Sequence, residues 1–391
     1  MRWAALVVVL SGSPAQTLLF AALGPILPMI AARFGAGGDG AFISQMVMTM
    51  PALGIILGGL VSGLVIERCG VRRVLYASLS AYAVLGSAGM YLDNSMSLLA
   101  SRFLLGIAVA HQSPCVVMLL AERFDETARA RLLGYQGAVS GIASFTALVS
   151  AGVLAEWAGW RAPFAIYLLA LPVLVCAVLV ERASPVPRAA PITGTGRGSI
   201  LPLWKIYAVV IPLYVAVLMT SIQLSFLLAA DGVTSAFSRS WVIAMGSAGS
   251  TCSGGAFGYL LSRLGARRTW VALACGMGFG FLVIGVATST VSIAAGCLLS
   301  GVGAGLTTPY FTGVILSRST VETRGRALGF MYTSVYLADF LNPVLIAPLR
   351  IAIGIHGAFM AVGGVLIATA IGMAIYRRRA PTGLATVSAP R

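Results

Sequence analysis

Charged residues are scarce in this chain, and acidic residues are the scarcest. Only 9% of its residues are charged, with 11 Asp and Glu against 26 Lys and Arg, whereas 59% are hydrophobic. A soluble domain carries about 25% charged residues, and the mean hydropathy of this chain is +0.95. The shortage of charge therefore excludes a water-soluble fold and indicates a protein that lies almost wholly in a membrane.

Residues that bind metals or carry out catalysis are also few. The six cysteines are scattered, with no CxxC pair, so we expect neither disulfides nor a metal site. The only histidines are His111 and His356, and the sequence has no HExxH motif and no nucleotide-binding glycine loop. We therefore expect no cofactor, no enzymatic activity and no ATP-driven pump.

The sequence contains long runs of apolar residues. Trp3–Ala32, Phe164–Val180 and Ala358–Tyr376 are nearly unbroken and do not alternate in polarity as barrel strands do. A hydrocarbon core of about 30 Å needs roughly 20 apolar residues for each helical crossing. The sequence therefore predicts an all-α membrane protein of about twelve transmembrane helices, and we interpret the first run as a helix rather than a signal peptide.

The basic residues are distributed unevenly between the predicted loops. Most of the 26 fall on one side of the membrane, only Arg33, Arg161, Arg239 and Arg350 fall on the other, and Arg102 lies within a helix. By the positive-inside rule both termini are then cytoplasmic, in a plasma membrane that we expect to be a bacterial inner membrane. Topology thus explains the net charge of +15, so we expect contact with the lipid bilayer and not with nucleic acid.

A polar stretch at 181–205, rich in Pro, Gly and Arg, divides the chain in two. We expect a bundle of about six helices at 1–180, a cytoplasmic linker at 181–205, a second such bundle at 206–376 and a cytoplasmic tail at 377–391. The halves also match each other at a constant shift of 195 positions. The residues Gly63, Gly70, Arg72, Arg73, Gly106, Pro114, Arg123, Arg129, Arg131 and Gly134 fall on Gly258, Gly265, Arg267, Arg268, Gly301, Pro309, Arg318, Arg324, Arg326 and Gly329.

Three short motifs resemble those of one transporter family. The conformational loop motif after the second predicted helix is similar to the G-x-x-x-D-R-x-G-R-R signature of the major facilitator superfamily, with Glu in place of Asp. Its residues are Gly63, Glu67, Arg68, Gly70, Arg72 and Arg73. Arg102–Gly106 and Gly159–Phe164 also resemble elements of that family, closest in pattern to its bacterial proton-coupled drug and metabolite antiporters. The helix 5 signature of many antiporters is incomplete, because no proline follows Gly137–Gly141.

This resemblance implies two pseudo-symmetric six-helix bundles related by an axis along the membrane normal. It also implies that Glu67, Arg68 and Arg72 brace one conformation of the protein, although Arg68, Arg72 and Arg73 could simply anchor the loop at the membrane surface. Arg102 matches the family element associated with proton coupling.

One acid lies deep in a predicted helix. Asp339 shares a face with Tyr332, Tyr336 and Pro343, at about 100° per residue, and Asn342 lies beside that face. Burial disfavours the charged form of a carboxylate, so Asp339 could bind and release a proton as its access changes. It could instead be a static partner of a hydroxyl or a cation.

Other polar residues in the spans are candidates with open roles. Arg102 and His111 are separated by about 180° of helical rotation and so point in opposite directions on a straight helix. His111 could titrate near neutral pH or be a hydrogen-bonded packing residue. Uncharged polar side chains could line a central cavity or join helices. These candidates are Gln16, Gln45, Gln112, Gln223, Tyr310, Tyr332, Tyr336 and Asn342.

Together these features predict a monomeric secondary transporter that works by alternating access, with protons as the coupling ion and Arg102 as the only fixed cation of the cavity. We expect a neutral, cationic or weakly acidic small amphipathic substrate that is exported rather than imported. The alternatives are proton-coupled uptake of a small organic anion or metallophore-like metabolite bound by Arg102, and a transport-derived membrane receptor without flux.

Overall fold

The computed structural model describes residues 2–35, 39–123, 126–183, 201–320 and 323–376, and all regular structure within them is helical. The N-terminal half holds α1 (Arg2–Ala21), η1 (Gly24–Ile26), α2 (Leu27–Phe34), α3 (Gly40–Cys69), α4 (Val71–Gly86), η3 (Ser87–Met90), α5 (Ser95–Arg123), α6 (Glu126–Ala158), η4 (Ala162–Leu169) and α7 (Ala170–Ala183). The C-terminal half holds η5 (Leu201–Leu203), α8 (Trp204–Ile222), α9 (Leu224–Ala230), α10 (Ala236–Val286), α11 (Thr290–Arg318) and α12 (Arg324–Tyr376). The predicted tail and most of the predicted linker lie outside the described residues.

The number of membrane crossings follows from helix lengths. Nine helical segments of the described chain are long and apolar enough to cross a membrane. Two of them, α10 with 51 residues and α12 with 53, are about twice as long as one crossing needs. Each bends at a glycine with non-helical φ, Gly265 (72°) or Gly354 (74°), and so forms two crossings. With these divisions and the shorter α4, the described residues form twelve crossings, in line with the sequence prediction of about twelve.

The first crossing of each half is interrupted, whereas the sequence predicts one continuous helix at Trp3–Ala32. The helix stops at the end of α1 and resumes as α2 after the turn η1, whose Pro25 has no N–H to donate to a continuing helix. In the other half, Gln223 separates α8 from α9. The first break leaves the carbonyl oxygen of Pro25 available to accept hydrogen bonds from side chains of the other half.

The 195-position repeat is present in the turns of the backbone. Gly70 has φ of 85° and Gly159 has φ of 78°, and the same left-handed conformation recurs at Gly265 and Gly354. Side chains with a Cβ rarely adopt this conformation, so glycine is the residue that permits each of these sharp turns between helices. The two halves therefore turn at equivalent positions.

The repeat is also present in helix packing. A Cβ placed on Gly54 would lie 2.1 Å from the carbonyl oxygen of Phe103, and one on Gly249 would lie 2.3 Å from that of Leu298. Only glycine allows backbones to approach this closely. The crossing of α3 on α5 and that of α10 on α11 are therefore two copies of one arrangement.

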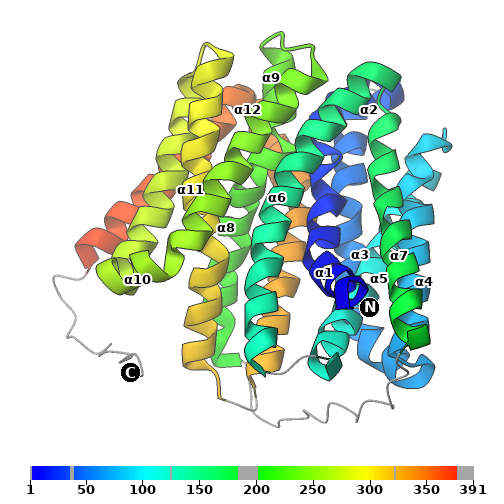
Figure 1. Ribbon diagram of the computed structural model, residues 1–391. Coiled ribbons are helices and arrows are strands. Elements are labelled where there is room, and N and C mark those ends of the chain that lie inside the picture. The colour runs from blue at the N-terminus through cyan, green and yellow to red at the C-terminus, as the bar shows by residue number, and fades with distance from the viewer. Residues whose placement is uncertain (1, 36–38, 124–125, 184–200, 321–322, 377–391) are drawn as a thin grey trace.

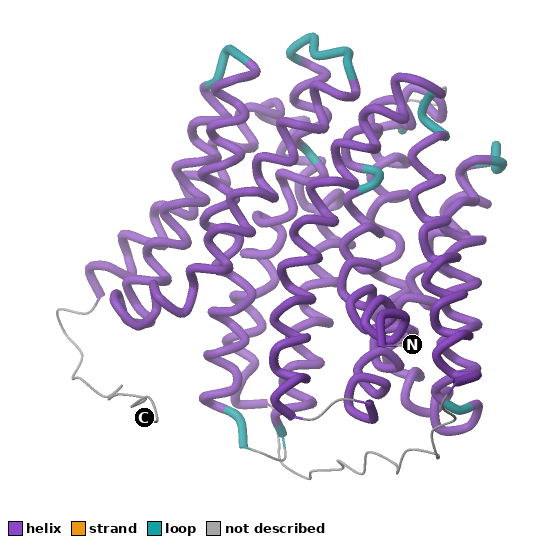
Figure 2. The backbone as a smooth tube through the Cα atoms, viewed as in Figure 1, coloured by secondary structure: helices purple, strands orange, loops and turns teal. Residues whose placement is uncertain are grey.

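The crossings run between two ends of the bundle (Figure 1). The motif end, at the bottom of that view, holds the turn between α3 and α4, the start of α6 and the end of α7. The distal end, at the top, holds the turn between α9 and α10 and the end of α2. Figure 2 shows that most described loops gather at these two ends, as expected where backbone inside lipid must be helical.

The two halves pack against each other through α6 on α10 and through α3 on α12. Glu156, in the last turn of α6, accepts hydrogen bonds from the backbone N–H of Phe237 (3.1 Å) and from the hydroxyl of Ser235, which caps α10. Ser144 and Ser247 are hydrogen-bonded at 3.3 Å nearer the centre. Contact between the halves therefore extends from the middle of the bundle to its distal end.

Glycines nearer the motif end face open space. A Cβ on Gly59 or Gly63 of α3, or on Gly255 or Gly258 of α10, would meet no heavy atom within 4 Å. The described helices are thus closed on one another at the distal end, while these glycine-lined surfaces of α3 and α10 are uncovered.

Candidate functional site

Three buried amides form a network that joins the two halves. The side-chain amide of Gln45 in α3 pairs with that of Gln223 at 3.3 and 3.4 Å, and Gln223 also donates to Asn342 Oδ1 in α12 at 3.1 Å. Asn342 donates in turn to the carbonyl oxygen of Val215 in α8, at 2.9 Å. All three amides are at most 1% exposed. We call Gln45, Gln223 and Asn342 the amide network.

The break between α8 and α9 positions the centre of this network. Gln223 is the residue at which the helix is interrupted, and its backbone N–H still bonds to the carbonyl oxygen of Met219, at 2.8 Å. Its side chain is left to face α3 and α12. Buried amides in lipid need internal partners, and these satisfy one another across the halves.

Asp339 lies one helical turn before Asn342 on α12 and is only 3% exposed. Its Oδ1 is buried and has no hydrogen-bond partner among the described residues. Tyr336, one turn earlier on the same helix, packs against the hydrophobic core of the N-terminal half. The carboxylate therefore lies on a helix that contacts both halves, beside the amide network.

Tyrosines add further polar groups to the helices of the C-terminal half. Tyr214 in α8 and Thr308 in α11 are hydrogen-bonded through their hydroxyls at 2.7 Å, a pair that the sequence analysis missed. The rule that picked out the other candidates, a polar side chain in an apolar span, would have found both. Tyr332 is 47% exposed, whereas Tyr310 packs its ring 5.7 Å from that of Trp270 within the same half.

Arg102 lies inside the N-terminal half. Its Nη2 donates to the carbonyl oxygens of Leu85 (2.8 Å) and Gly86 (2.6 Å) at the end of α4. Its guanidinium lies 5.0 Å from the ring centroid of Phe164 and 5.1 Å from that of Tyr167, and the residue is fully buried. No hydrogen bond or ion pair within the described part of the chain connects Arg102 to Asp339 or to the amide network.

A second guanidinium besides that of Arg102 is buried, and it lies where the two halves meet. Arg239, predicted to lie in a loop region, is 3% exposed in the first turn of α10. Its Nε donates to the carbonyl oxygen of Pro25 at 3.1 Å, and its Nη1 donates to those of Val233 and Thr234 at 2.9 and 3.0 Å. Arg239 thus links α10 to η1 of the other half.

The remaining candidates lie within the N-terminal half. His111 is hydrogen-bonded through Nδ1 to the carbonyl oxygen of Ile107 on its own helix, at 2.7 Å. Gln16 donates to the hydroxyl of Ser113 at 2.7 Å. Gln112 lines a mainly apolar cavity of about 100 Å³ between α1, α4, α5 and α7, and its Oε1 has no partner among the described residues. None of these three side chains forms a hydrogen bond with the amide network among the described residues.

The conformational loop motif lies at the motif end. Gly70 forms the turn, Glu67, Arg68 and Arg73 are exposed, and Arg72 is partly buried. Glu67 and Arg68 form no ion pair within the described residues. At the equivalent turn of the other half, Arg267 donates to the carbonyl oxygens of Met373 (2.7 and 3.1 Å) and Ala374 (2.6 Å) at the end of α12.

A duplicated bundle of twelve helices with a polar network between its halves defines the class of multi-pass membrane transport proteins. The chain belongs to the Major Facilitator Superfamily, whose family model matches residues 10–237 and 207–390. The family is one of membrane transporters and not of enzymes.

Curated relatives share part of this chain. The uncharacterized MFS-type transporter Rv1877 of Mycobacterium tuberculosis is 32% identical over 183 residues, which is 46% of this chain and 25% of that protein. The niacin transporter NiaP of Acinetobacter baylyi is 28% identical over 149 residues, 38% of this chain and 33% of that protein. The multidrug efflux pump Tap of Mycobacterium bovis is 30% identical over 119 residues, 30% of this chain and 28% of that protein. The aligned part thus covers 25–33% of the length of these relatives.

Solved structures share the fold over nearly the whole chain. A D-xylose-proton symporter superposes with a TM-score of 0.73 at 15% identity, covering 95% of each chain. The nucleoside transporter NupG superposes with a TM-score of 0.71 at 12% identity, covering 94% of this chain and 99% of that one. At such identities the likeness concerns the fold alone.

Proposed function

We propose that this chain is a proton-coupled transporter that exports a small amphipathic molecule, and that Asp339 binds the coupling proton or the substrate. The observation that carries this proposal is the buried carboxylate with an unpaired oxygen beside the amide network. A carboxylate in a low-dielectric interior is costly when charged and unpaired, so it favours either a bound proton or a cationic partner.

The same observation favours a cation among the substrates that the sequence left open. Arg102 and Arg239 are each bonded to backbone carbonyl oxygens, and neither faces Asp339. Asp339 lies one helical turn from Asn342 of the amide network, and neither arginine is hydrogen-bonded to that network among the described residues. A protonated amine could donate to Asp339 and to amide oxygens while its apolar part lies against Tyr336 and Tyr332.

Competition between a proton and a cation for one carboxylate also supports the direction. When Asp339 can hold one or the other, a proton that enters from outside displaces a cation that was bound from inside, and the result is proton-driven export. Efflux by the relative Tap supports this direction. We place both termini and the motif end in the cytoplasm of a bacterial inner membrane, on the positive-inside rule, and we propose that the monomer is the working unit.

The main alternative is uptake of a small organic anion, and a named relative, the niacin transporter NiaP, supports it. Arg102 would then have to meet the anion, but its guanidinium is held behind Phe164 and Tyr167. The third candidate is a receptor that binds a ligand without moving it.

A flux assay with two probes separates these functions. Purified protein in liposomes with an imposed pH gradient is given ethidium, an aromatic cation, or benzoate, an aromatic anion. We expect gradient-dependent movement of ethidium and not of benzoate. Movement of benzoate alone would favour the anion transporter, and binding of a probe without any flux would favour the receptor.

A further inference from the structure

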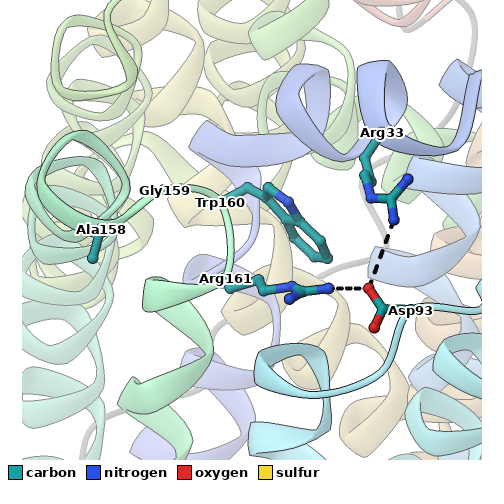
Figure 3. Close-up of a pocket in the computed structure, with 6 residues that line it drawn as sticks. All are labelled: Arg33, Asp93, Ala158, Gly159, Trp160 and Arg161. Carbon is teal, nitrogen blue, oxygen red and sulfur yellow. Dashed lines mark hydrogen bonds and ion pairs between the residues drawn. The ribbon is translucent and has the colours of Figure 1, made fainter.

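A cavity lies at the distal end of the N-terminal half, and none of its lining residues belongs to the amide network. It has a volume of about 330 Å³ and is lined by Arg33, Asp93, Ala158, Gly159, Trp160 and Arg161 (Figure 3). Arg33 is in the last turn of α2, Asp93 is in the turn before α5, and Trp160 and Arg161 form the turn between α6 and η4. We call it the distal pocket.

Charge in the distal pocket is unbalanced. Arg33 and Arg161 approach the same carboxylate oxygen, Asp93 Oδ1, from different sides, as Figure 3 shows; the distance from Arg33 Nη2 is 3.6 Å. Two guanidinium groups thus share one carboxylate. Nε of Arg161 is buried and has no hydrogen-bond partner among the described residues. Two guanidinium groups against one carboxylate leave the pocket with one net positive charge among its lining residues.

The ends of the spans place this pocket at the surface of the membrane. The apolar spans that contribute its lining end at Phe34 and Ala158 and begin at Ser95 and Ala162. All four of these span ends are within a few residues of a pocket residue in the sequence. The charged groups of the pocket therefore lie at the boundary between the hydrocarbon core and the lipid headgroups. Trp160 has the position typical of aromatic residues at that level.

Apolar side chains flank the pocket on the outside of the bundle. Trp157 is 86% exposed, Tyr91 is 58% exposed and Met96 is 72% exposed, and each lies within a few residues of a pocket residue in the sequence. Trp160 itself is held between the rings of Phe34 and Phe164, with centroids 6.0 Å away in each case. The surroundings thus offer a fixed polar cavity with apolar surface beside it.

We propose that the distal pocket binds the headgroup of a phospholipid, with the phosphate on Arg33 and Arg161. Guanidinium groups bind phosphate through charge-assisted hydrogen bonds, and the phosphate would balance the remaining positive charge. An ethanolamine headgroup fits best, because its ammonium group pairs with Asp93 while its acyl chains lie along the exposed apolar side chains. This proposal does not depend on the substrate or the direction of transport.

The C-terminal half provides an internal comparison. His356 stands 195 positions after Arg161 and pairs with Asp231 at 2.9 Å. That pair has one possible cation for one carboxylate among the described residues, so it leaves no charge for a phosphate. The proposal therefore assigns a lipid site to the N-terminal half alone.

Native mass spectrometry of delipidated protein titrated with dioleoylphosphatidylethanolamine tests the proposal. We expect one tightly bound lipid on the wild-type protein, and about tenfold weaker binding on the variant Arg33→Gln/Arg161→Gln. The matched control His356→Gln should bind as the wild type does. Equal binding by the wild type and the double variant would overturn the proposal.

Two further measurements keep the test decisive. The single variant Arg33→Gln changes a half-exposed side chain, and we expect it to fold normally and to bind the lipid more weakly, so that failure of the double variant to fold does not remove the test. Free phosphoethanolamine and inorganic phosphate are titrated alongside. If either binds as tightly as the lipid, the pocket is an anion site and the assignment to a phospholipid is wrong.

Discussion

At the scale of single residues, Asp339 is the one buried acid among those whose exposure the structure describes. Asp93, Glu156 and Asp231 each have a partner at the distal surface, and Glu67 is exposed at the motif end. Asp339 is 3% exposed and its Oδ1 is unpaired. A charge in that position is tolerated only if a mobile partner neutralises it, and this sets Asp339 apart as the group whose loss should affect coupling rather than folding.

We expect Asp339→Asn to abolish flux driven by a pH gradient and to leave the protein folded. The amide has the same shape, resembles the protonated acid and removes only the titration. Ethidium flux in liposomes and thermal unfolding in detergent measure the two effects separately. Asp231→Asn, an acid of the same half at the distal surface, serves as the control and should transport normally. Wild-type flux by Asp339→Asn would remove this residue from the mechanism.

Arg102 should matter first for stability. Its side chain fills the space between Phe164, Tyr167 and the end of α4, so Arg102→Ala leaves a cavity and frees two carbonyl oxygens. We expect a loss of about 2–5 kcal/mol in the free energy of unfolding, by analogy with other large-to-small core substitutions. Thermal unfolding measures it, with the half-exposed Arg33→Ala as the control. An unchanged unfolding temperature would show that the guanidinium is not a packing element of this half.

Residue type picks out the polar side chains in the apolar spans, but it does not show which of them meet. Gln16, Gln45, Gln112 and Gln223 share one signature, an amide in an apolar span. Gln45 and Gln223 meet between the halves, whereas Gln16 and Gln112 stay within the N-terminal half. The difference depends on helix rotation and on the packing of one half against the other, which a single sequence does not encode in any local pattern.

At the scale of elements, α6 and α10 form the described closure of the distal end. The carboxylate of Glu156 accepts from the backbone N–H of Phe237 and from the hydroxyl of the cap residue Ser235, at the start of α10, where the helix dipole favours negative charge. Gly152 of α6 also lies against Ser240 of α10, so the two helices pack closely there. This contact should set how often the distal end opens.

Glu156→Gln should open the distal end more often. Loss of the charge weakens the interaction with the helix end by about 0.3–1 kcal/mol, which corresponds to a two- to fivefold change in an opening equilibrium. A cysteine introduced as Ser240→Cys in a cysteine-free background reports opening through its rate of labelling by an impermeant maleimide. Glu67→Gln, an exposed acid at the motif end, is the control and should not raise this rate. Equal rates in both variants would mean that Glu156 does not hold the distal end closed.

Element boundaries followed the sequence where glycine or proline determines the backbone. The turn at Gly70 and its copy at Gly265 fall within the predicted repeat. The interruption of the first helix was not predicted, although Pro25 explains it. The interruption at Gln223 has no such signal. Glutamine has no intrinsic preference that would end a helix. The break coincides instead with the hydrogen bonds that the side chain of Gln223 forms with Gln45 and Asn342.

At the scale of the whole molecule, corresponding helices of the two halves run in the same direction across the membrane. Turns with positive φ recur at the same shift of 195 positions as the Gly and Arg residues of the internal repeat, so a parallel duplication, and not an inverted one, relates the halves. Equivalent positions of the two halves must therefore lie on the same face of the membrane. Direction of transport and placement of the distal pocket in one leaflet both depend on this orientation.

Labelling of introduced cysteines tests the orientation directly. In a cysteine-free background we expect Arg68→Cys and Arg263→Cys, which are 195 positions apart, to react with an impermeant maleimide from the cytoplasmic face only, because the positive-inside rule places the motif end there. Asp231→Cys, in the turn between α9 and α10, should react from the outer face only. Reaction of the first two variants from opposite faces would contradict the parallel duplication. Reaction of all three from the faces opposite to those expected would keep the duplication but reverse the orientation, and with it the proposed direction of export.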